Sequence, residues 1–339
     1  MVYSDIHDQA MQPNSFMTSN VETTVSVNQV SRYYDKLLAV NNLSFSMQRG
    51  EILGLLGPNG AGKSTTMQMI TGNLAPSSGQ ISINQFDILD DPKQAKLELG
   101  YLPEKPPLYA DFKVDEFLLF CAKLNRISKS HQNKAIDSAK QRCALGDVGS
   151  RLIGNLSKGY QQRVGIAQAI IHNPALIIFD EPTVGLDPIQ IREIRQLIRE
   201  LGKEHAVILS THILPEVTST CDRVLIINKG ELVLTESTEG LQKRMFSSSL
   251  LVGFHQPPDK QTLLQFDGIS EVDKVRDNVF RLHHDPDIDP SDSIVVSSVN
   301  EGWKLFELTP EKLSLEEVFL EITTTETHEN KTTSAMESI

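Results

Sequence analysis

Residues 52–65 read ILGLLGPNGAGKST, and this stretch decides the fold. Its apolar first half is typical of a buried strand, and its second half has the spacing GxxxxGK[ST]. Three apolar residues then recur at helical spacing, namely Met67, Ile70 and Leu74. A glycine-rich loop between a strand and a helix turns backbone N–H groups around a phosphate, and the positive end of the helix dipole faces the same anion. The stretch therefore predicts a nucleotide phosphate-binding loop.

The loop is predicted to bind both phosphate and metal. Lys63 is expected to contact the β- and γ-phosphates of ATP, and the Ser64 hydroxyl to ligate Mg²⁺. The alternative is a chance glycine-rich turn before a helix, which the presence of both Lys63 and Ser64 disfavours. The predicted nucleotide-binding residues of the loop are Gly57, Pro58, Asn59, Gly60, Ala61, Gly62, Lys63, Ser64 and Thr65.

The wider pattern of apolar residues predicts an α/β fold. Short apolar runs alternate with helical patterns up to about residue 245, and the strand candidates are ILGLL, ISI, ALIIF, AVILS and RVLIIN. Such alternation favours a mixed, largely parallel sheet covered by helices. Two further strands are expected in TVSVNQVS, from Thr24, and in AVNNLSFSMQRG, which ends in a turn at Arg49-Gly50.

The chain is predicted to hold two domains between polar ends. Residues 1–22 and 325–339 are polar and lack any period, so we expect mobile tails there. Residues 23–245 form the predicted ATPase domain, with a helical insertion at about 104–155. A small α+β accessory domain is predicted at 246–324. It is expected to start with a Ser- and Pro-bearing joint, SSSLLVGFHQPPDK, to continue with strand-like VFRL, SIVVSS and KLFEL, and to end with a helix, LSLEEVFLEI.

Composition excludes several classes of protein. The 39% of hydrophobic and 22% of charged residues are those of an ordinary globular chain, and no apolar run is long enough to cross a membrane. The N-terminus carries neither a secretory nor a lipidation pattern, so we expect a complete chain that stays in the cytosol. Cys121, Cys143 and Cys221 lack metal-binding spacing and are predicted to be buried packing residues.

The net charge of −12 lies almost wholly in the last quarter of the chain. Residues 250–339 hold 18 acidic and 7 basic side chains, a net charge of −11. An acidic chain without a basic block is poorly suited to bind nucleic acid, whose phosphates must be neutralised by cationic side chains. We therefore expect no nucleic-acid partner.

Two adjacent carboxylates end the apolar run of ALIIFDEP, residues 175–182. In a phosphate-loop enzyme a carboxylate at this strand end holds Mg²⁺, usually through water, and Asp180 is predicted to do so. Glu181, one residue further on, is predicted to polarise the water that attacks the γ-phosphate. The alternative is that both are ordinary acids at the solvent boundary of a strand.

The stretch LSKGYQQRVGIAQAI, residues 156–170, resembles the LSGGQ signature of the ABC family. Lys158 replaces the first glycine of that signature and Tyr160 replaces its glutamine, whereas Ser157 and Gly159 are retained. The resemblance implies that these two retained residues bind the γ-phosphate of an ATP held by another subunit. The alternative is a capped helix that packs its apolar residues inward, namely Val164, Ala167 and Ile171.

Other motifs resemble the same family in the same order along the chain. The resemblance implies that Tyr34 stacks on adenine, although neighbouring Tyr33 is an alternative, and that Asp187 of VGLDP lies at a dimer seam. It also implies that His212 of STHIL contacts the γ-phosphate and orients the attacking water. Glu104 stands where the family usually has a glutamine metal ligand; it keeps an oxygen for Mg²⁺ but adds a negative charge beside the phosphate.

The resemblance covers roughly residues 24–245 and implies an ATP-binding subunit of an ABC transporter. Its fold is expected to combine the parallel-rich core with an antiparallel β subdomain and a helical insertion. GYLPE, the signature and the C-terminal helix together resemble an export-type branch that includes gliding-motility and multidrug exporters. The family pattern implies a homodimer with two ATP molecules between its subunits. It also implies a polytopic membrane permease as partner, met at the cytoplasmic face of the inner membrane.

Two alternative functions are considered. A soluble ABC ATPase of translation, repair or regulation usually has two cassettes or a long coiled coil, but one cassette is present and residues 66–156 contain no sustained heptads. A regulator that binds nucleotide without hydrolysis is disfavoured, because the residues expected to bind phosphate and metal and to hydrolyse ATP are all retained: Lys63, Asp180, Glu181 and His212.

Overall fold

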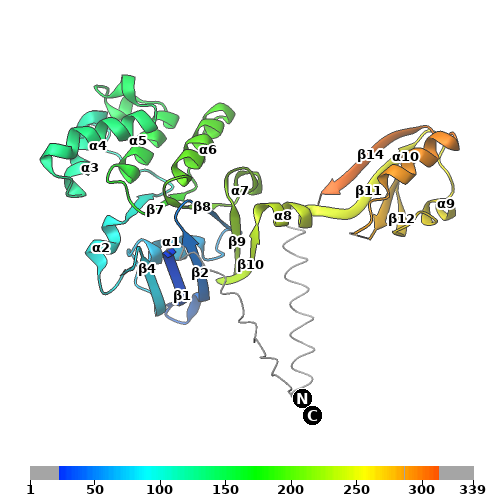
Figure 1. The fold of residues 1–339 in the computed structure, drawn as a ribbon, viewed down its shortest axis with the longest axis horizontal. Helices are drawn as coiled ribbons and strands as arrows, with labels where there is room; N and C mark the ends of the chain where they lie inside the picture. The colour runs from blue at the N-terminus through cyan, green and yellow to red at the C-terminus, as the bar shows by residue number, and fades with distance from the viewer. Residues whose placement is uncertain (1–22, 286, 313–339) are drawn as a thin grey trace, which may run out of the picture.

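A computed structural model of the protein describes residues 23–285 and 287–312 (Figure 1). A six-stranded sheet of order β10-β9-β3-β8-β7-β6 forms its centre. Five of these strands run parallel, and β10 runs antiparallel to β9. The strands are β3 (Ile52–Leu56), β6 (Leu99–Leu102), β7 (Leu176–Asp180), β8 (Ala206–Thr211), β9 (Arg223–Asn228) and β10 (Glu231–Ser237). The predicted largely parallel α/β sheet is confirmed.

A second, antiparallel sheet of order β2-β1-β4-β5 packs on one face of the central sheet. Alternate residues of the central strands, such as Leu176 and Ile178 of β7, share a core with it. Helix α1 (Lys63–Ile70) contributes Met67 and Ile70 to the same core. The elements on this side also include β1 (Thr23–Tyr34), β2 (Leu37–Gln48), β4 (Ser78–Ile83), β5 (Phe86–Asp87) and α2 (Pro92–Leu97).

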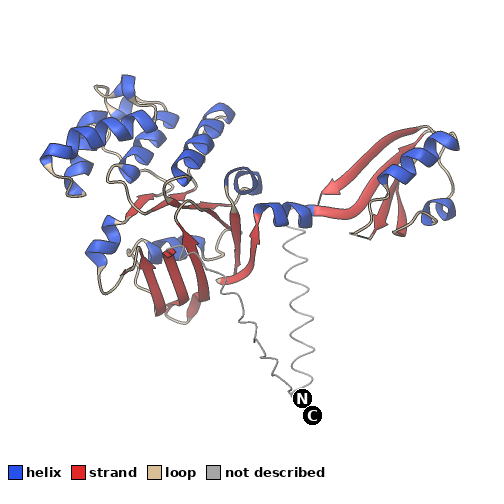
Figure 2. Cartoon of the chain, in the orientation of Figure 1, coloured by secondary structure: helices blue, strands red, loops and turns tan. Residues whose placement is uncertain are grey.

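Helices cover the opposite face (Figures 1 and 2). Ile177 and Phe179 of β7 belong to the hydrophobic core on this side. Helices α3 and α4 lie in the predicted insertion, and α5 packs against both of them. All three cysteines are buried and free, as predicted. No helix within the described ranges is both long and apolar enough to cross a membrane. The helices on this side are α3 (Val114–Leu124), α4 (Lys129–Arg142), α5 (Lys158–Ile170), α6 (Pro188–Gly202) and α7 (Leu214–Thr220).

A third sheet, of order β12-β13-β11-β14, follows helix α8 and has its own hydrophobic core. Figure 1 shows it standing away from the central sheet, at the far end of α8. All its strand pairings are antiparallel. Its elements and α8 are α8 (Thr238–Met245), β11 (Phe246–Phe254), α9 (Lys260–Leu264), β12 (Ile269–Arg276), β13 (Val279–His284), α10 (Ser291–Asn300) and β14 (Leu305–Lys312).

Two predictions for this C-terminal part are wrong. SSSLLVGF is not a joint but most of strand β11, in which Leu250, Val252 and Phe254 are buried at the alternate spacing of a strand. SIVVSS is not a strand but lies in helix α10, where Ile294 and Ser298 are buried four residues apart. VFRL and KLFEL do fall on strands β13 and β14. The predicted tails and the whole of the predicted LSLEEVFLEI helix, residues 313–322, lie outside the described residues.

Candidate nucleotide-binding site

The loop between β3 and α1 has a backbone that requires glycine. Gly60 and Gly62 adopt φ of 81° and 107°, in the left-handed region that side chains disfavour. A Cβ on Gly62 would lie 2.8 Å from the carbonyl oxygen of Ala39, and one on Gly57 would collide with the carbonyl of Ile227. The loop can therefore wrap closely only with glycine at these positions, as an anion-binding turn needs.

Lys63, the first residue of α1, lies inside this loop. Its Nζ donates hydrogen bonds to the carbonyl oxygens of Gly57 and Pro58, at 2.7 and 3.1 Å, and the residue is only 8% exposed. Burial lowers the pKa of the Lys63 amine, while the nearby charges of Glu181 and Asp180 oppose that shift. The cation and the two carboxylates therefore share one site, although the sequence separates them by more than a hundred positions.

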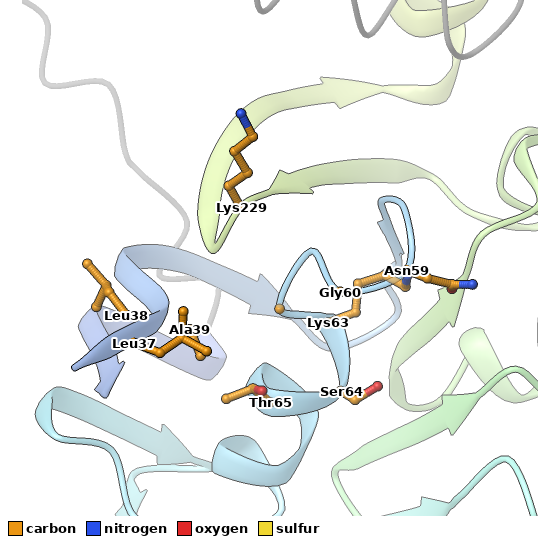
Figure 3. Close-up of a pocket in the computed structure, with 10 residues that line it drawn as sticks. Leu37, Leu38, Ala39, Asn59, Gly60, Lys63, Ser64, Thr65 and Lys229 are labelled. Carbon is orange, nitrogen blue, oxygen red and sulfur yellow. The ribbon is translucent and has the colours of Figure 1, made fainter. Parts of the chain in front are cut away.

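A pocket of about 400 Å³ opens beside the loop (Figure 3). Three segments form it: the start of β2, the loop with the start of α1, and the turn between β9 and β10. Tyr34 is not among its lining residues; it pairs with Leu37 across the β1–β2 hairpin, and the Arg32 guanidinium lies 5.1 Å from its ring centre. The lining residues are Leu37, Leu38, Ala39, Asn59, Gly60, Gly62, Lys63, Ser64, Thr65 and Lys229.

Four of these lining residues are not among the residues predicted from the sequence, namely Leu37, Leu38, Ala39 and Lys229. Leu37, Leu38 and Ala39 come just after the turn Asp35-Lys36 that follows the predicted adenine-stacking tyrosine, so the nearness of that tyrosine in the sequence is the signal that could have found them. Lys229 lies on a turn more than 160 residues from the loop, and no local pattern marks it.

Asp180 and Glu104 gather at the carboxyl ends of neighbouring strands β7 and β6. Burial is the main cause that raises the pKa of the Asp180 carboxyl, and the charge of Glu104 acts in the same direction. Tyr101 of β6 is also close, since burial and the charge of Asp180 raise its pKa to about 12. The carboxylate oxygens together with the Ser64 hydroxyl are hard oxygen donors, which is the donor type that Mg²⁺ prefers.

Glu181 and His212 form a close pair at the ends of β7 and β8. His212 Nδ1 lies 2.7 Å from Glu181 Oε1, and the backbone N–H of Glu181 donates to the carbonyl of Ser210 at 2.9 Å. Glu181 has φ of 48°, a left-handed conformation whose strain is of order 1–3 kcal/mol for a residue with a side chain. This strained turn directs the carboxylate toward the edge of the sheet where ligands of open α/β folds bind.

A buried carboxylate that was not predicted from the sequence is linked to Glu181 through the hydroxyl of Thr211. Glu216 of α7 is 1% exposed. Its Oε1 accepts hydrogen bonds from Thr183 Oγ1 at 2.5 Å and Arg195 Nη2 at 3.4 Å, and its Oε2 accepts from Thr211 Oγ1 at 3.0 Å. The sequence offered no signal for it, because its partners come from three separate segments.

The signature-like segment lies at the start of α5 and is partly accessible. Ser157 is exposed and caps the helix by accepting the N–H of Tyr160 at 3.5 Å, whereas Gly159 is buried under Gln190. Asp187 caps α6 by accepting the N–H groups of Ile189 and Gln190, at 3.0 and 2.9 Å. The two cap residues therefore belong to adjoining helix starts, and neither lines the pocket beside the phosphate loop.

A glycine loop that closes around a lysine, at the carboxyl edge of a parallel sheet with two acids beside it, defines a phosphate-loop nucleotide-binding protein. The ABC transporter family matches residues 40–184. The chain is 33% identical over 305 residues to the uncharacterized ABC transporter ATP-binding protein YxlF of Bacillus subtilis, covering 88% of this chain and 99% of that protein. The chain belongs to the ABC transporter family, as an ATP-binding subunit and ATPase.

Other relatives support the same family. The chain is 38% identical to the bacitracin transport ATP-binding protein BcrA of Bacillus licheniformis, over 66% of this chain and 73% of that protein. A solved ATP-binding subunit of an ABC transporter matches with a TM-score of 0.60 at 31% identity, over 66% of this chain and 93% of the other. The family and fold expected from the sequence are thus confirmed.

Proposed function

We propose that two copies of this chain clamp two molecules of ATP and hydrolyse them to drive export of a substrate through a separate membrane permease. The observation that carries the proposal is the gathering of Lys63, Asp180, Glu181 and His212 beside the glycine loop. Export is supported by relatives whose names concern bacitracin transport and linearmycin resistance, the latter 30% identical over 96% of its own length.

The residues are proposed to act in the following roles. The loop and Lys63 bind the phosphates, while Asp180, Ser64 and Glu104 hold Mg²⁺, which supplies positive charge to the β- and γ-phosphate oxygens. Glu181 accepts a proton from the attacking water, and His212, fixed by Glu181, contacts the γ-phosphate. Tyr34 stacks on the adenine at the edge of the pocket. Lys63 and Ser64 lie at the start of α1, and Asp180, Glu181 and His212 lie at or next to the ends of β7 and β8.

The dimer is proposed because one chain does not complete the site. Ser157 is exposed at a helix N-terminus, where a hydroxyl and backbone N–H groups can bind phosphate, yet residues 156–160 are absent from the lining of the chain's own pocket. A second copy can bring its Ser157 and Gly159 to that pocket, with Asp187 at the seam. Loss of the γ-phosphate then removes the ligand that bridges both copies, so hydrolysis opens the dimer.

The permease is proposed to contact the helical part and to hold the chain at the cytoplasmic face of the membrane. Tyr109, Phe112 and Phe120 form an aromatic cluster there, with ring centres 5.3 to 6.3 Å apart, and they are 53%, 37% and 36% exposed. Large aromatic rings left at the surface in a group are typical of a protein interface. Co-purification of a polytopic membrane protein with the tagged chain supports transport over a stand-alone ATPase role.

The Glu181→Gln variant tests the site. Proton acceptance by a positioned carboxylate contributes about 10²- to 10⁴-fold in rate, so phosphate release is expected to fall by at least about 10²-fold. The isosteric amide leaves the phosphate-binding groups in place, so an ATP-dependent dimer persists in gel filtration with Mg-ATP. Normal phosphate release by this variant overturns the role of Glu181, and an unchanged monomer in Mg-ATP overturns the clamp.

A further inference from the structure

The hydroxyl of Thr211 lies between two carboxylates but has a single proton to donate. It is 3.0 Å from Glu216 Oε2 and 3.4 Å from Glu181 Oε2. The same oxygen accepts the backbone N–H of Ile213 at 3.1 Å. A hydroxyl donates one hydrogen bond at a time, so the two carboxylates compete for it. The shorter distance favours donation to Glu216.

The other oxygen of Glu216 is held firmly on the opposite side. Its Oε1 accepts from Thr183 Oγ1 and lies 3.4 Å from Arg195 Nη2. Thr183, Thr211 and Glu216 are each no more than 3% exposed, so water does not compete effectively for these bonds. The carboxylate is therefore fixed in orientation and presents Oε2 to Thr211.

We propose that Glu216 is a positioning residue for hydrolysis: it accepts the hydrogen bond that the Thr211 hydroxyl donates, and so keeps Glu181 Oε2 available to the attacking water. The inference rests on the proposed role of Glu181. Glu216 also links the segment after β7, through Thr183, to the segment after β8, through Thr211. These two segments carry Glu181 and His212.

The Glu216→Gln variant has a defined expected geometry. Its amide oxygen is expected on the side of Thr183 and Arg195, because both of these side chains donate hydrogen bonds. The opposite orientation would place the amide nitrogen, itself a donor, against the guanidinium. The amide nitrogen then faces Thr211, whose oxygen accepts from it. The hydroxyl proton of Thr211 is left to turn toward Glu181 Oε2, where it occupies a lone pair that the water needs.

We expect Glu216→Gln to lower kcat about tenfold or more, which is part of the 10²- to 10⁴-fold that proton transfer contributes. KM for ATP and ATP affinity are expected to stay within about twofold, because the phosphate-binding groups are unchanged. Adding Thr211→Val removes the misdirected proton, so the double variant is expected to hydrolyse severalfold faster than Glu216→Gln alone. A purely structural role predicts the reverse order.

Thr183→Val is the matched control, because it removes a hydroxyl bond to the same carboxylate without touching Glu181. It is expected to lower Tm about as much as Glu216→Gln but to retain a higher kcat. A kcat of Glu216→Gln equal to wild type, or a double variant no faster than Glu216→Gln, overturns the inference. If Glu216→Gln does not fold, a tenfold loss of kcat in Thr211→Val alone overturns it.

The Glu181→Gln variant in the same assay separates the two proposals. If Glu181→Gln hydrolyses normally, the role of Glu181 fails and this inference fails with it. If Glu181→Gln is inactive while Glu216→Gln keeps wild-type kcat, only the positioning role of Glu216 falls.

Discussion

Glu104 is the residue of the proposed metal site at which this chain departs from the usual family pattern. Its charge acts on Asp180 at the carboxyl ends of neighbouring strands. A second negative charge beside the proposed γ-phosphate repels ATP when no metal is bound. Because such a site is partly open to solvent, this repulsion is about 1 kcal/mol. In the proposed complex, Mg²⁺ is the cation that balances this charge.

Glu104→Gln is therefore expected to bind metal-free ATP about fivefold more tightly, which corresponds to ~1 kcal/mol, and to gain less for Mg-ATP. Fluorescence titration with and without Mg²⁺ measures both affinities. Glu98→Gln, at the other end of β6, is the matched control and is expected to change neither affinity. Equal gains in the two conditions contradict the assigned place of Glu104.

Single residues differ in how far the sequence predicts them. Lys63 and Ser64 follow from local spacing, because a phosphate loop is one continuous segment. Glu104 and Asp180 could be brought together only through the order of strands in the sheet. Glu216 could not be predicted at all, because a buried carboxylate is recognised by partners that folding brings from elsewhere. Tyr34, predicted from resemblance, lies beside the pocket without lining it.

Helices α5 and α6 each begin at a residue with a proposed second role. Asp187 caps α6 with two hydrogen bonds, and loss of such a cap lowers the free energy of unfolding by about 1 kcal/mol. Asp187→Ala is thus expected to lower Tm, whereas Asp187→Ser retains a capping oxygen and Tm. If Asp187 also lies at the dimer seam, Asp187→Ser still loses hydrolysis, by about tenfold or ~1.4 kcal/mol of activation free energy.

Thermal melting and phosphate release of the same preparations check this expectation. Asp259→Ala provides the control, because Asp259 caps α9 in the C-terminal sheet by accepting the N–H of Thr262 at 2.7 Å. It is expected to lose a cap without losing hydrolysis. If Asp187→Ser hydrolyses ATP at the wild-type rate, the role at the dimer seam is refuted, and Asp187 serves only to cap α6.

The strands of the central sheet could be predicted from the sequence, whereas only some elements of the C-terminal sheet could. Runs such as ALIIF are buried on both faces, so their composition alone indicates a strand. SIVVSS has similar composition, but it forms a helix that buries Ile294 and leaves Val296 and Val299 59% and 76% exposed. Packing of one face overrides the strand preference of β-branched residues there. In β11 the cause is different: the serines at its start hide the alternation of apolar and polar residues that marks a strand.

The whole molecule is proposed to work only as a pair, and mixing two inactive variants tests this. Lys63→Ala disables the phosphate loop, and Gly159→Asp places a charge and bulk at the signature-like helix start, where Gln190 already lies close. Each variant alone is expected to be inactive. In a mixed dimer one site combines an intact loop with an intact signature, so an equal mixture is expected to recover on the order of a quarter of wild-type hydrolysis.

Phosphate release across a series of mixing ratios checks the expectation. Activity is expected to peak at equal amounts and to vanish at either end of the series. Gly159→Asp alone must still bind ATP at its own loop, which shows that the variant is folded. If no mixture hydrolyses ATP although both variants dimerise, the shared site is refuted.

The C-terminal sheet is set apart from the central sheet by α8, and the residues from 250 onward carry most of the excess negative charge (Figure 1). In the proposed dimer, closure on ATP gathers two copies of segment 250–339, each of net charge −11, into one particle. Their mutual repulsion extends over about 10 Å at 0.1 M ionic strength and further in dilute buffer. We therefore expect the ionic strength of the medium to influence assembly of the proposed dimer independently of the nucleotide.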